Sequence, residues 1–542
     1  MVAPRTLSFG GGLGWAAEVV PLLRLALPVV LANGLQQSLQ IVDAAFAGHL
    51  GTDELAACSL GNFIFNIIWA FLLGVATALD TLASQAAGAG DTVALRRCGV
   101  AAAAVMLVLC LPACAVLQQS AWVLERCFGQ SKRLSQMAQR YCRGLLPGIP
   151  PLALFTVAQR LQLAQGRALP SILTLLAANL LNCGTNLLFI WRLGLGFDGS
   201  PLGTSVVRAA ALLLLLLSEL LLSDRRIDHG RSGRGGGWLC PWPGPGPPCR
   251  GPCPCGSLSS GVGPVLDLVR LGLPGGVSLG VEAWAFEALA VLASLLGKVS
   301  LDACAILLSL CSLAFTALPF GVAVAASIHV GNLLGAQQPR RAQATAGAAL
   351  RLGVAAMLAA SAALLLLRPR LASLFTADTA VAARVAAVAP VVALLQVVDG
   401  YQAVAAGVLR GLGRQPAVAA VNVLSFWLIG VPLGAGATFG AQGGIGGLWA
   451  GLTVGLAAGC ACYAWMLRRV EWPDEARKAL RRSTRLGTKG GADAACGLAE
   501  PLRHDWSGTS AASSSSSNQT QHTQAGIRSS DFERVAFTGC GP

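Results

Sequence analysis

The chain has 542 residues, of which 54% are hydrophobic and only 12% are charged, and its formal net charge is +14. A soluble domain carries about 25% charged residues, so this composition excludes an ordinary soluble protein and predicts a polytopic membrane protein. The basic residues lie between apolar runs and in the C-terminal tail, as orientation in a membrane requires, so the charge does not indicate binding of nucleic acid.

Twelve apolar segments are long enough to be spanning helices, and they form two sets of six. The stretch between the sets is polar and then rich in Gly and Pro, so it cannot pack a core. We therefore predict an all-α polytopic membrane protein with twelve transmembrane helices in two parallel six-helix lobes. Its parts are a cytosolic N-terminus (1–21), a first lobe (22–222), a cytosolic linker (223–262), a second lobe (263–470) and a disordered cytosolic tail (471–542). The segments are 22–48, 54–86, 97–118, 144–166, 169–191, 201–222, 264–297, 303–334, 345–367, 381–411, 417–439 and 444–467.

The positions of the basic residues predict the orientation of the chain. With the N-terminus inside, the inner loops carry clusters such as Arg96 with Arg97 and Arg340 with Arg341. The outer loops are poorer in Arg and Lys, except at 126–143 and in the ninth loop, which adds Arg368 and Arg370. The positive-inside rule then puts both termini in the cytosol. No cleavable signal peptide precedes the first apolar run, so we expect the first helix to act as its own insertion signal.

The two sets of segments repeat each other in sequence. The run RLALP from Arg24 to Pro28 recurs as RLGLP from Arg270 to Pro274, and Gly88 matches Gly335 at the same offset to within one residue. An even number of spans per repeat inserts both halves the same way up. Two parallel lobes with a cavity between them are typical of transporters that alternate access by rocking, whereas a channel needs no such duplication.

One apolar segment carries two acidic residues. Between Leu271 and Leu296 the only formal charges are Glu282 and Glu287. An ionised carboxylate inside a span costs free energy unless it is solvated, paired or protonated, so the pair predicts a water-filled cavity with a function. Helix geometry points the two side chains about 140° apart, so they share a cavity only if it is wide or the helix is deformed. The alternative is that each carboxylate makes a structural hydrogen bond to a neighbouring helix.

A third acidic residue, Asp399, lies inside the segment 381–411. Nearby in the sequence, Tyr401 offers an aromatic ring, and Trp284 lies between the two glutamates. Such rings would give a bound cation an aromatic face, although aromatic side chains in membrane helices more often pack against neighbours.

The first lobe has polar groups of its own. Asp43 is ionisable within a span, and Asn182 and Asn186 are four residues apart and share one face of their helix. Gln36 adds an amide to the helix of Asp43. We predict that these residues take part in binding; the alternative is that the amides only hydrogen-bond neighbouring helices.

Other chemistry is not indicated. The linker cysteines Cys240, Cys249, Cys253 and Cys255 do not match the paired C-x2-C spacing of zinc sites, so we expect no metal. No nucleophile–base pair or phosphate-binding loop stands out, so we expect neither an enzyme nor a cofactor.

Several motifs together resemble a known family. They are Val42-Asp43 and the run from Leu79 to Gln85 in the first lobe, and the runs from Glu282 to Glu287 and from Val322 to Gly335 in the second. These residues resemble the multidrug and toxin extrusion (MATE) transporters, and specifically the animal branch of that family. The resemblance covers about 22–470.

The resemblance implies proton-coupled export of organic cations and xenobiotics at the plasma membrane. In the animal branch, acidic residues of the second lobe are thought to bind the cation and the proton. By motif, that role carries over to Glu282, Glu287 and Asp399, where Asp stands in place of the usual Glu. A carboxylate in a low-dielectric cavity holds either a proton or a cation, so the binding of one displaces the other.

The expected partners follow from this resemblance. They are organic cations, protons and the lipid bilayer, without nucleic acid, and the protein is expected to work as a monomer. The sequence departs from the family at Leu308–Leu310, where another Glu is expected, and at Arg208, which puts a positive charge inside the sixth span.

Three alternatives remain open on sequence. The same carboxylates would serve a sodium-coupled drug exporter. A flippase of lipid-linked substrates has a similar plan, but it would need a cationic cavity for a phosphate headgroup, and the identifiable charges inside the spans are mainly acidic. A channel is the third alternative, and saturable, trans-stimulated exchange would exclude it.

Overall fold

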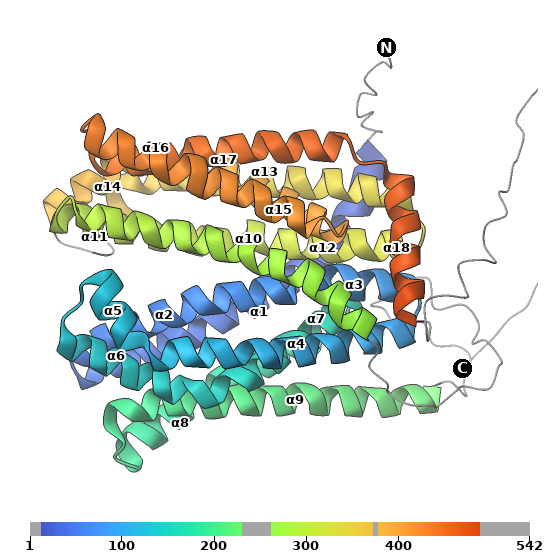
Figure 1. Cartoon of the computed structure of the whole chain (residues 1–542), viewed down its shortest axis with the longest axis horizontal. Coiled ribbons are helices and arrows are strands. Elements are labelled where there is room, and N and C mark those ends of the chain that lie inside the picture. Colours follow the sequence, from blue (N-terminus) through green and yellow to red (C-terminus); the bar gives the residue numbers. More distant parts are fainter. Residues whose placement is uncertain (1–11, 230–261, 372–374, 376–377, 488–542) are drawn as a thin grey trace, which may run out of the picture. The chain divides into compact units, whose positions relative to one another are not determined.

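The structure, a computed structural model, describes residues 12–229, 262–371, 375 and 378–487 (Figure 1). The described residues form helices and contain no β-strand. Eleven of their helical runs are long and apolar enough to cross a membrane. The predicted all-α polytopic fold class is therefore confirmed.

The remaining predicted span, 144–166, corresponds to a shorter helix. α7 (Ile149–Ala164) has 16 residues and follows α6 (Lys132–Leu145) through the 3-10 turn Leu146–Gly148. Pro150 and Pro151 stand in the first turn of α7, where a missing N–H and a fixed φ are tolerated, so the apolar helix begins there.

The first half of the described chain forms nine α-helices, and the second span of this half is broken after Ala76. Asp91 caps α4 by accepting a hydrogen bond from the Ala94 amide at 2.8 Å. The helices are α1 (Gly12–Leu50), α2 (Thr52–Ala76), α3 (Ala78–Gly88), α4 (Thr92–Gln118), α5 (Ser120–Phe128), α6 (Lys132–Leu145), α7 (Ile149–Ala164), α8 (Leu169–Leu187) and α9 (Gly199–His229).

The second half repeats this plan, and its second span is broken before Pro319. π-helical segments at Val423–Gly430 and Gly436–Gly440 interrupt its fifth span. The helices are α10 (Val262–Ser294), α11 (Lys298–Ala317), α12 (Pro319–Gly335), α13 (Pro339–Leu371), α14 (Thr379–Gly411), α15 (Gln415–Asn422), α16 (Val431–Ala435), α17 (Gly444–Arg468) and α18 (Trp472–Gly487).

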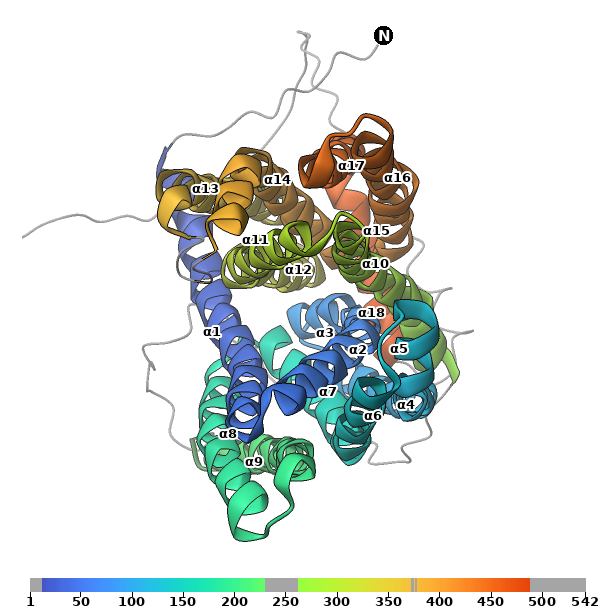
Figure 2. The same cartoon turned by 90° about the vertical axis from the view of Figure 1, so that its left-hand side faces the viewer.

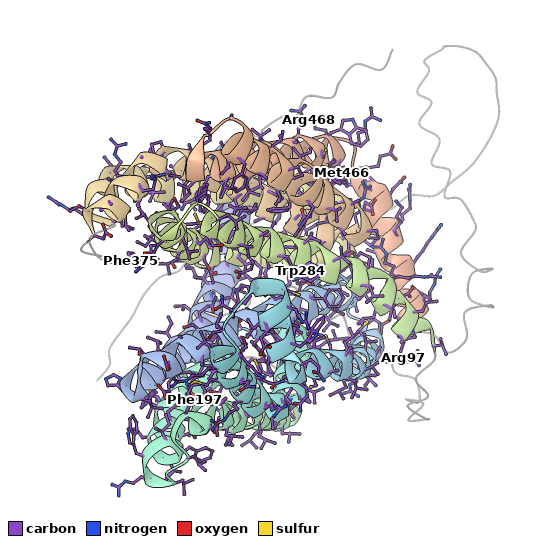
Figure 3. The ribbon with its side chains drawn as sticks, turned by 60° about the vertical axis from the view of Figure 1, so that its left-hand side comes forward. Arg97, Phe197, Trp284, Phe375, Met466 and Arg468 are labelled. Carbon is purple, nitrogen blue, oxygen red and sulfur yellow. The ribbon has the colours of Figure 1, made fainter. Side chains whose placement is uncertain are left out.

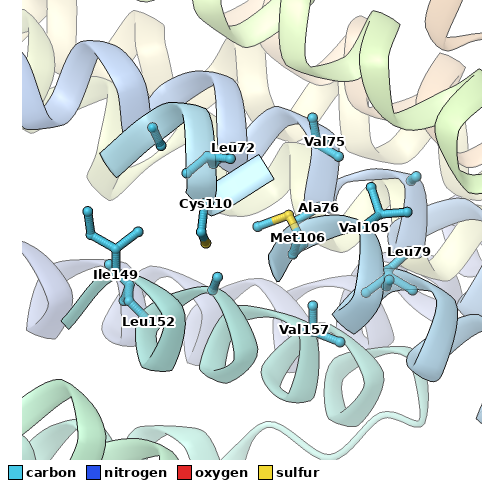
Figure 4. Packing of buried hydrophobic residues seen from close by; sticks show 14 of the residues in the cluster. Leu72, Val75, Ala76, Leu79, Val105, Met106, Cys110, Ile149, Leu152 and Val157 are labelled. Carbon is cyan, nitrogen blue, oxygen red and sulfur yellow. The ribbon is translucent and has the colours of Figure 1, made fainter. Parts of the chain in front are cut away.

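Viewed along the helices, α1–α9 and α10–α17 gather into two groups, which we call the N-terminal and C-terminal groups (Figure 2). The core of the N-terminal group lies between α2, α3, α4 and α7. The side chains that interdigitate there include Leu72, Leu79, Met106, Cys110 and Val157 (Figure 4). Lipid is as apolar as these side chains, so close van der Waals packing, more than burial from water, stabilises the group.

The first helix of each group begins against the other group. Leu22 and Ala26 of α1 pack in the core of the C-terminal group, and Leu268 of α10 packs in the core around α2–α4. At the start of α1, Glu18 forms an ion pair with Arg341 of α13 at 3.0 Å. Each group therefore packs against the first helix of the other, as the sequence repeat leads one to expect.

α3 and α12 meet in a seam where backbone lies against backbone. A Cβ atom added to Gly88 would lie 2.0 Å from the carbonyl oxygen of Asn332, and one added to Gly335 would lie 2.1 Å from that of Gln85. Gln85 also donates a hydrogen bond to the carbonyl of Gly411 at 3.0 Å. Only glycine allows this approach, and the close contact holds the two groups together at this end.

α18 corrects the prediction that everything beyond residue 470 is disordered. The helix is amphipathic, and its apolar face, which includes Trp472, Ala479 and Leu486, packs on the protein while its charged face is exposed. It crosses the ends of both groups (Figure 1): Arg97 donates to the Leu486 carbonyl at 2.9 Å, and Arg482 donates to the Leu412 carbonyl at 3.1 Å. A window long enough to detect a membrane span overlooks a short, charged helix of this kind.

The ends of the predicted linker are also helical. α9 continues to His229 and α10 begins at Val262. The predicted linker 223–262 therefore begins too early, because its first residues, 223–229, belong to α9. The rest of the linker, with its four cysteines, and the tail beyond residue 487 lie outside the described residues.

Candidate functional site

Two of the predicted acidic residues are brought together in the C-terminal group. Glu282 lies on α10 and Asp399 on α14, where Asp399 is 5% exposed. The two carboxylates lie within electrostatic range of each other. α10 reaches this place by packing directly on α2, because Gly275 leaves room for the carbonyl of Gly74.

Asn422 of α15 connects this pair to its surroundings. Its amide nitrogen donates to the Ser278 hydroxyl at 3.0 Å and, more weakly, to Glu282 Oε2 at 3.4 Å. Its carbonyl oxygen accepts from the hydroxyl of Tyr463 at 2.5 Å. Glu282 therefore receives a single long hydrogen bond from the described residues, which leaves most of its acceptor capacity free.

The other predicted residues of this group make no hydrogen bond or ion pair with Glu282 or Asp399 in the described part of the chain. Glu287 makes no hydrogen bond or ion pair with any described residue. The Trp284 indole donates to the Ile67 carbonyl of α2 at 3.2 Å, at the boundary between the two groups (Figure 3). Tyr401 packs against the core cluster that contains Tyr463. The shared cavity for Glu282, Glu287 and Asp399 stays a prediction.

In the N-terminal group, the structure brings three predicted residues together. Asp43 is 1% exposed and accepts hydrogen bonds from Asn182 at 2.9 Å and from Asn186 at 3.0 Å. Thr204 of α9 donates to its other oxygen at 2.6 Å. Thr204 was not predicted from the sequence, although a polar pair, Thr204-Ser205, inside an apolar span was a usable signal.

A cavity of about 260 Å³ lies beside Asp43. α1, α2, α7, α8 and α9 form most of its wall, with a contribution from α11 and α12. Gln36 and Asp43 line it, as do aromatic side chains such as Phe65 and Trp69, whereas Glu282, Glu287 and Asp399 are not part of the wall. The cavity beside Asp43 is thus separate from the pair Glu282 and Asp399.

Two buried arginines also line the cavity. Arg160 donates from Nη1 to both carboxylate oxygens of Asp80, at 2.7 and 2.6 Å. Arg208 lies over the ring of Phe65 at 4.5 Å. The Arg160–Asp80 pair was not predictable from the sequence, since the two residues come from different helices and no periodicity connects them.

No group of three or more His, Cys, Asp or Glu side chains within the described ranges could hold a metal ion. The linker cysteines lie outside those ranges. The chemistry available in the described sites is therefore that of carboxylates, amides, guanidinium groups and aromatic rings.

Two groups of spanning helices, with buried polar clusters inside them, are the architecture of a secondary transporter. A sequence profile described as MatE matches this chain twice, at residues 28–188 and 274–435, so each half of the repeat is matched separately. The chain belongs to the MatE family, and the resemblance inferred from the sequence motifs is confirmed.

Relatives in the same family cover most of the chain. It is 31% identical over 467 residues to multidrug and toxin extrusion protein 1 of Mus musculus, covering 85% of this chain and 76% of that protein. It is 30% identical over 470 residues to the protein of the same name in Homo sapiens, with 85% and 76% covered. The solved structure of the eukaryotic MATE transporter AtDTX14 matches with a TM-score of 0.77 and 24% identity, covering 87% of this chain and all of that one, 100%.

Proposed function

We propose that this multi-pass transporter exports organic cations and other xenobiotics in exchange for protons. It would act as a monomer at the plasma membrane, with both termini in the cytosol. The observation that carries the proposal is the pair Glu282 and Asp399, two carboxylates inside the C-terminal group that lie within electrostatic range and are not saturated by hydrogen bonds from the described residues.

The physical basis is competition for the same oxygen atoms. Two carboxylates this close in a low-dielectric place repel each other when both are ionised, so either a proton or an organic cation relieves the repulsion. Binding a proton from one side then displaces the cation, and loss of the proton on the other side restores its site. Asn422 and Tyr463 orient Glu282 without occupying it fully.

The remaining predicted residues have supporting roles in this proposal. Glu287 lies further along α10 and extends the acidic path, and Trp284 and Tyr401 contribute aromatic surface. In the N-terminal group Asp43, held by Asn182 and Asn186, and Gln36 belong to the cavity that faces the substrate. Rocking of the two groups would open the seam between α3 and α12, which is closed in this structure.

The test uses purified protein in liposomes, with labelled tetraethylammonium as substrate and no sodium present. A pH step alone should drive saturable uptake that unlabelled cation on the opposite side stimulates. Uptake that needs a sodium gradient and does not respond to the pH step would show that the coupling ion is sodium and not the proton. Uptake that does not saturate would contradict an exchanger altogether.

A further inference from the structure

The two arginines of the cavity in the N-terminal group are in different states. Arg160 is satisfied by Asp80. Arg208 is 8% exposed, and within the described residues it makes no hydrogen bond and no ion pair. Its Nη1 atom is shielded and lacks an acceptor. Burying a guanidinium without an acceptor costs free energy, so such a group calls for an explanation, and an anion that binds there is one.

The position of Arg208 is fixed by its neighbours. It lies one turn after Thr204 on α9, and its guanidinium stacks on the ring of Phe65 at 4.5 Å. Its side-chain stem packs beside Gly148, where an added Cβ would lie 3.1 Å from Arg208 Cδ. The donors of the guanidinium are therefore held in the cavity wall instead of swinging out to solvent.

Asp43 balances the charge of Arg208 without satisfying it. The two groups lie within electrostatic range. However, the oxygens of Asp43 already accept hydrogen bonds from Asn182, Asn186 and Thr204, and no ion pair joins Asp43 to Arg208 in the described structure. The directional N–H donors of Arg208 remain available.

The surroundings of Arg208 suit an aromatic molecule that carries an anion. The Asn33 amide nitrogen, in the same cavity wall, also has no acceptor among the described residues. Phe65, Trp69 and Phe155 supply flat apolar walls. The cavity, about 260 Å³, lies near the lower limit of small-molecule pockets, about 300 Å³, so a molecule with one ring is the appropriate size.

We propose that this cavity binds the anionic group of a small aromatic carboxylate or sulfonate, with Arg208 as its anchor and Asn33 as a second donor. The planar guanidinium matches the two oxygens of such a group. The proposal rests on the transport function proposed above, and it extends the substrates of the protein to organic anions. The site is separate from Glu282 and Asp399, which do not line this cavity.

The experiment measures binding to the full-length protein in nanodiscs by isothermal titration calorimetry. Benzenesulfonate should bind saturably. The affinity for uncharged benzenesulfonamide should be lower by ~10-fold or more. Arg208→Gln should weaken sulfonate binding by ~10- to 100-fold, and Arg208→Lys should weaken it less, because a charge remains but the fork is lost. Arg192→Gln, at an exposed arginine that ends the π-helical turn Leu188–Arg192 after α8, is the matched control and should change nothing.

Equal binding of the two probes, or an unchanged affinity in Arg208→Gln, would overturn the proposal and leave Arg208 as a counter-charge of Asp43. Displacement of the sulfonate by chloride at equal concentration would make the site a halide site and would also overturn it. If Arg208→Gln does not fold, the comparison of the two probes on the wild-type protein decides. The titration needs no gradient, so failure of pH-driven cation uptake leaves this result standing, and the reverse holds as well.

Discussion

The two groups of helices hold their buried carboxylates in opposite ways. Asp43 of the N-terminal group accepts three hydrogen bonds, from Asn182, Asn186 and Thr204, all at 3.0 Å or less. From the described residues, Glu282 of the C-terminal group accepts a single hydrogen bond, at 3.4 Å. A carboxylate whose acceptors are occupied is fixed in place, whereas one with free acceptors can exchange its partner. The same repeated scaffold thus holds one acid with its acceptors occupied and, in the proposed mechanism, one acid that can exchange its partner.

The sequence repeat shows that the acids of the two halves do not stand at equivalent positions. At the offset that relates Arg24 to Arg270, Gln36 corresponds to Glu282 and Asp43 corresponds to Leu289. The two halves therefore share the helices but place their acids at different positions.

The amides of α8 have diverged as well. At the offset that relates Gly166 to Gly413, Asn182 and Asn186 correspond to Ile429 and Leu433. The C-terminal group has lost, or never had, the two amides that saturate the carboxylate of the N-terminal group.

The largest expected effect is that of Glu282→Gln. If Glu282 is the exchangeable acid, its neutral isostere should reduce proton-driven cation uptake by ~10-fold or more, since it holds neither a proton nor a charge. Uptake into liposomes with equal amounts of folded protein measures this. Glu471→Gln, at an exposed glutamate between α17 and α18, is the control. Near-normal uptake with a normal pH profile would remove Glu282 from the mechanism.

The counterpart in the N-terminal group is Asp43→Ala, which should affect stability first. It removes a buried acceptor from three donors, which keep only backbone carbonyls as partners, and the loss of such hydrogen bonds costs about 1–3 kcal/mol in total. Thermal unfolding of the purified protein should show a clear loss, while Asp43→Asn, which keeps one acceptor oxygen, should lose less. Asp53→Ala, at an exposed ion pair with Arg133, should change stability by only about 0.5 kcal/mol. If Asp43→Ala is as stable as the wild type but does not transport, Asp43 acts in transport and not in stabilising the N-terminal group, which would contradict the comparison.

Asp399 sharpens the comparison within the C-terminal group. Asp399→Asn should reduce cation uptake several-fold and alter its dependence on pH, because one of two interacting acids no longer titrates. Asp399→Glu keeps the charge and should be tolerated better. A titration of uptake against pH in both variants measures this. An active Asn variant with an unmoved profile would show that Asp399 does not interact with Glu282 during exchange.

The smallest expected effect is that of Tyr463→Phe. It removes one hydroxyl that donates to Asn422 and so orients the group next to Glu282, at a cost of about 0.5–1.5 kcal/mol. The apparent affinity for the cation should fall by no more than ~10-fold, with the maximal rate preserved. Tyr401→Phe is the matched control and should behave as wild type. A total loss of exchange in Tyr463→Phe would mean that the hydroxyl itself takes part in proton transfer.

The sequence predicted the spans and the duplication because both depend on long, strong signals. Apolar length and an offset repeated at several motifs do not depend on tertiary contacts. Two elements were missed for a physical reason: α7 is shortened by prolines at its start, and α18 is too short and too charged to resemble a span.

The candidate sites were predictable only in part. Asn182 and Asn186 could be placed on one face because they share a helix, whereas Thr204 comes from a different one. The approach of Glu282 to Asp399, and the role of Asn422 beside them, depend on how α10, α14 and α15 are rotated against each other. No periodicity within a single segment records that rotation.

The glycine seam between α3 and α12 has one more consequence. Gly88 corresponds to Gly335 in the repeat, and at the same offset Gln85 corresponds to Asn332. Gly88 approaches Asn332, and Gly335 approaches Gln85, so each half offers the other the same surface that it receives. That is the isologous pattern of a two-fold symmetric homodimer, here within a single chain. Two half-length polypeptides, made separately, would already carry complementary surfaces through which they could associate.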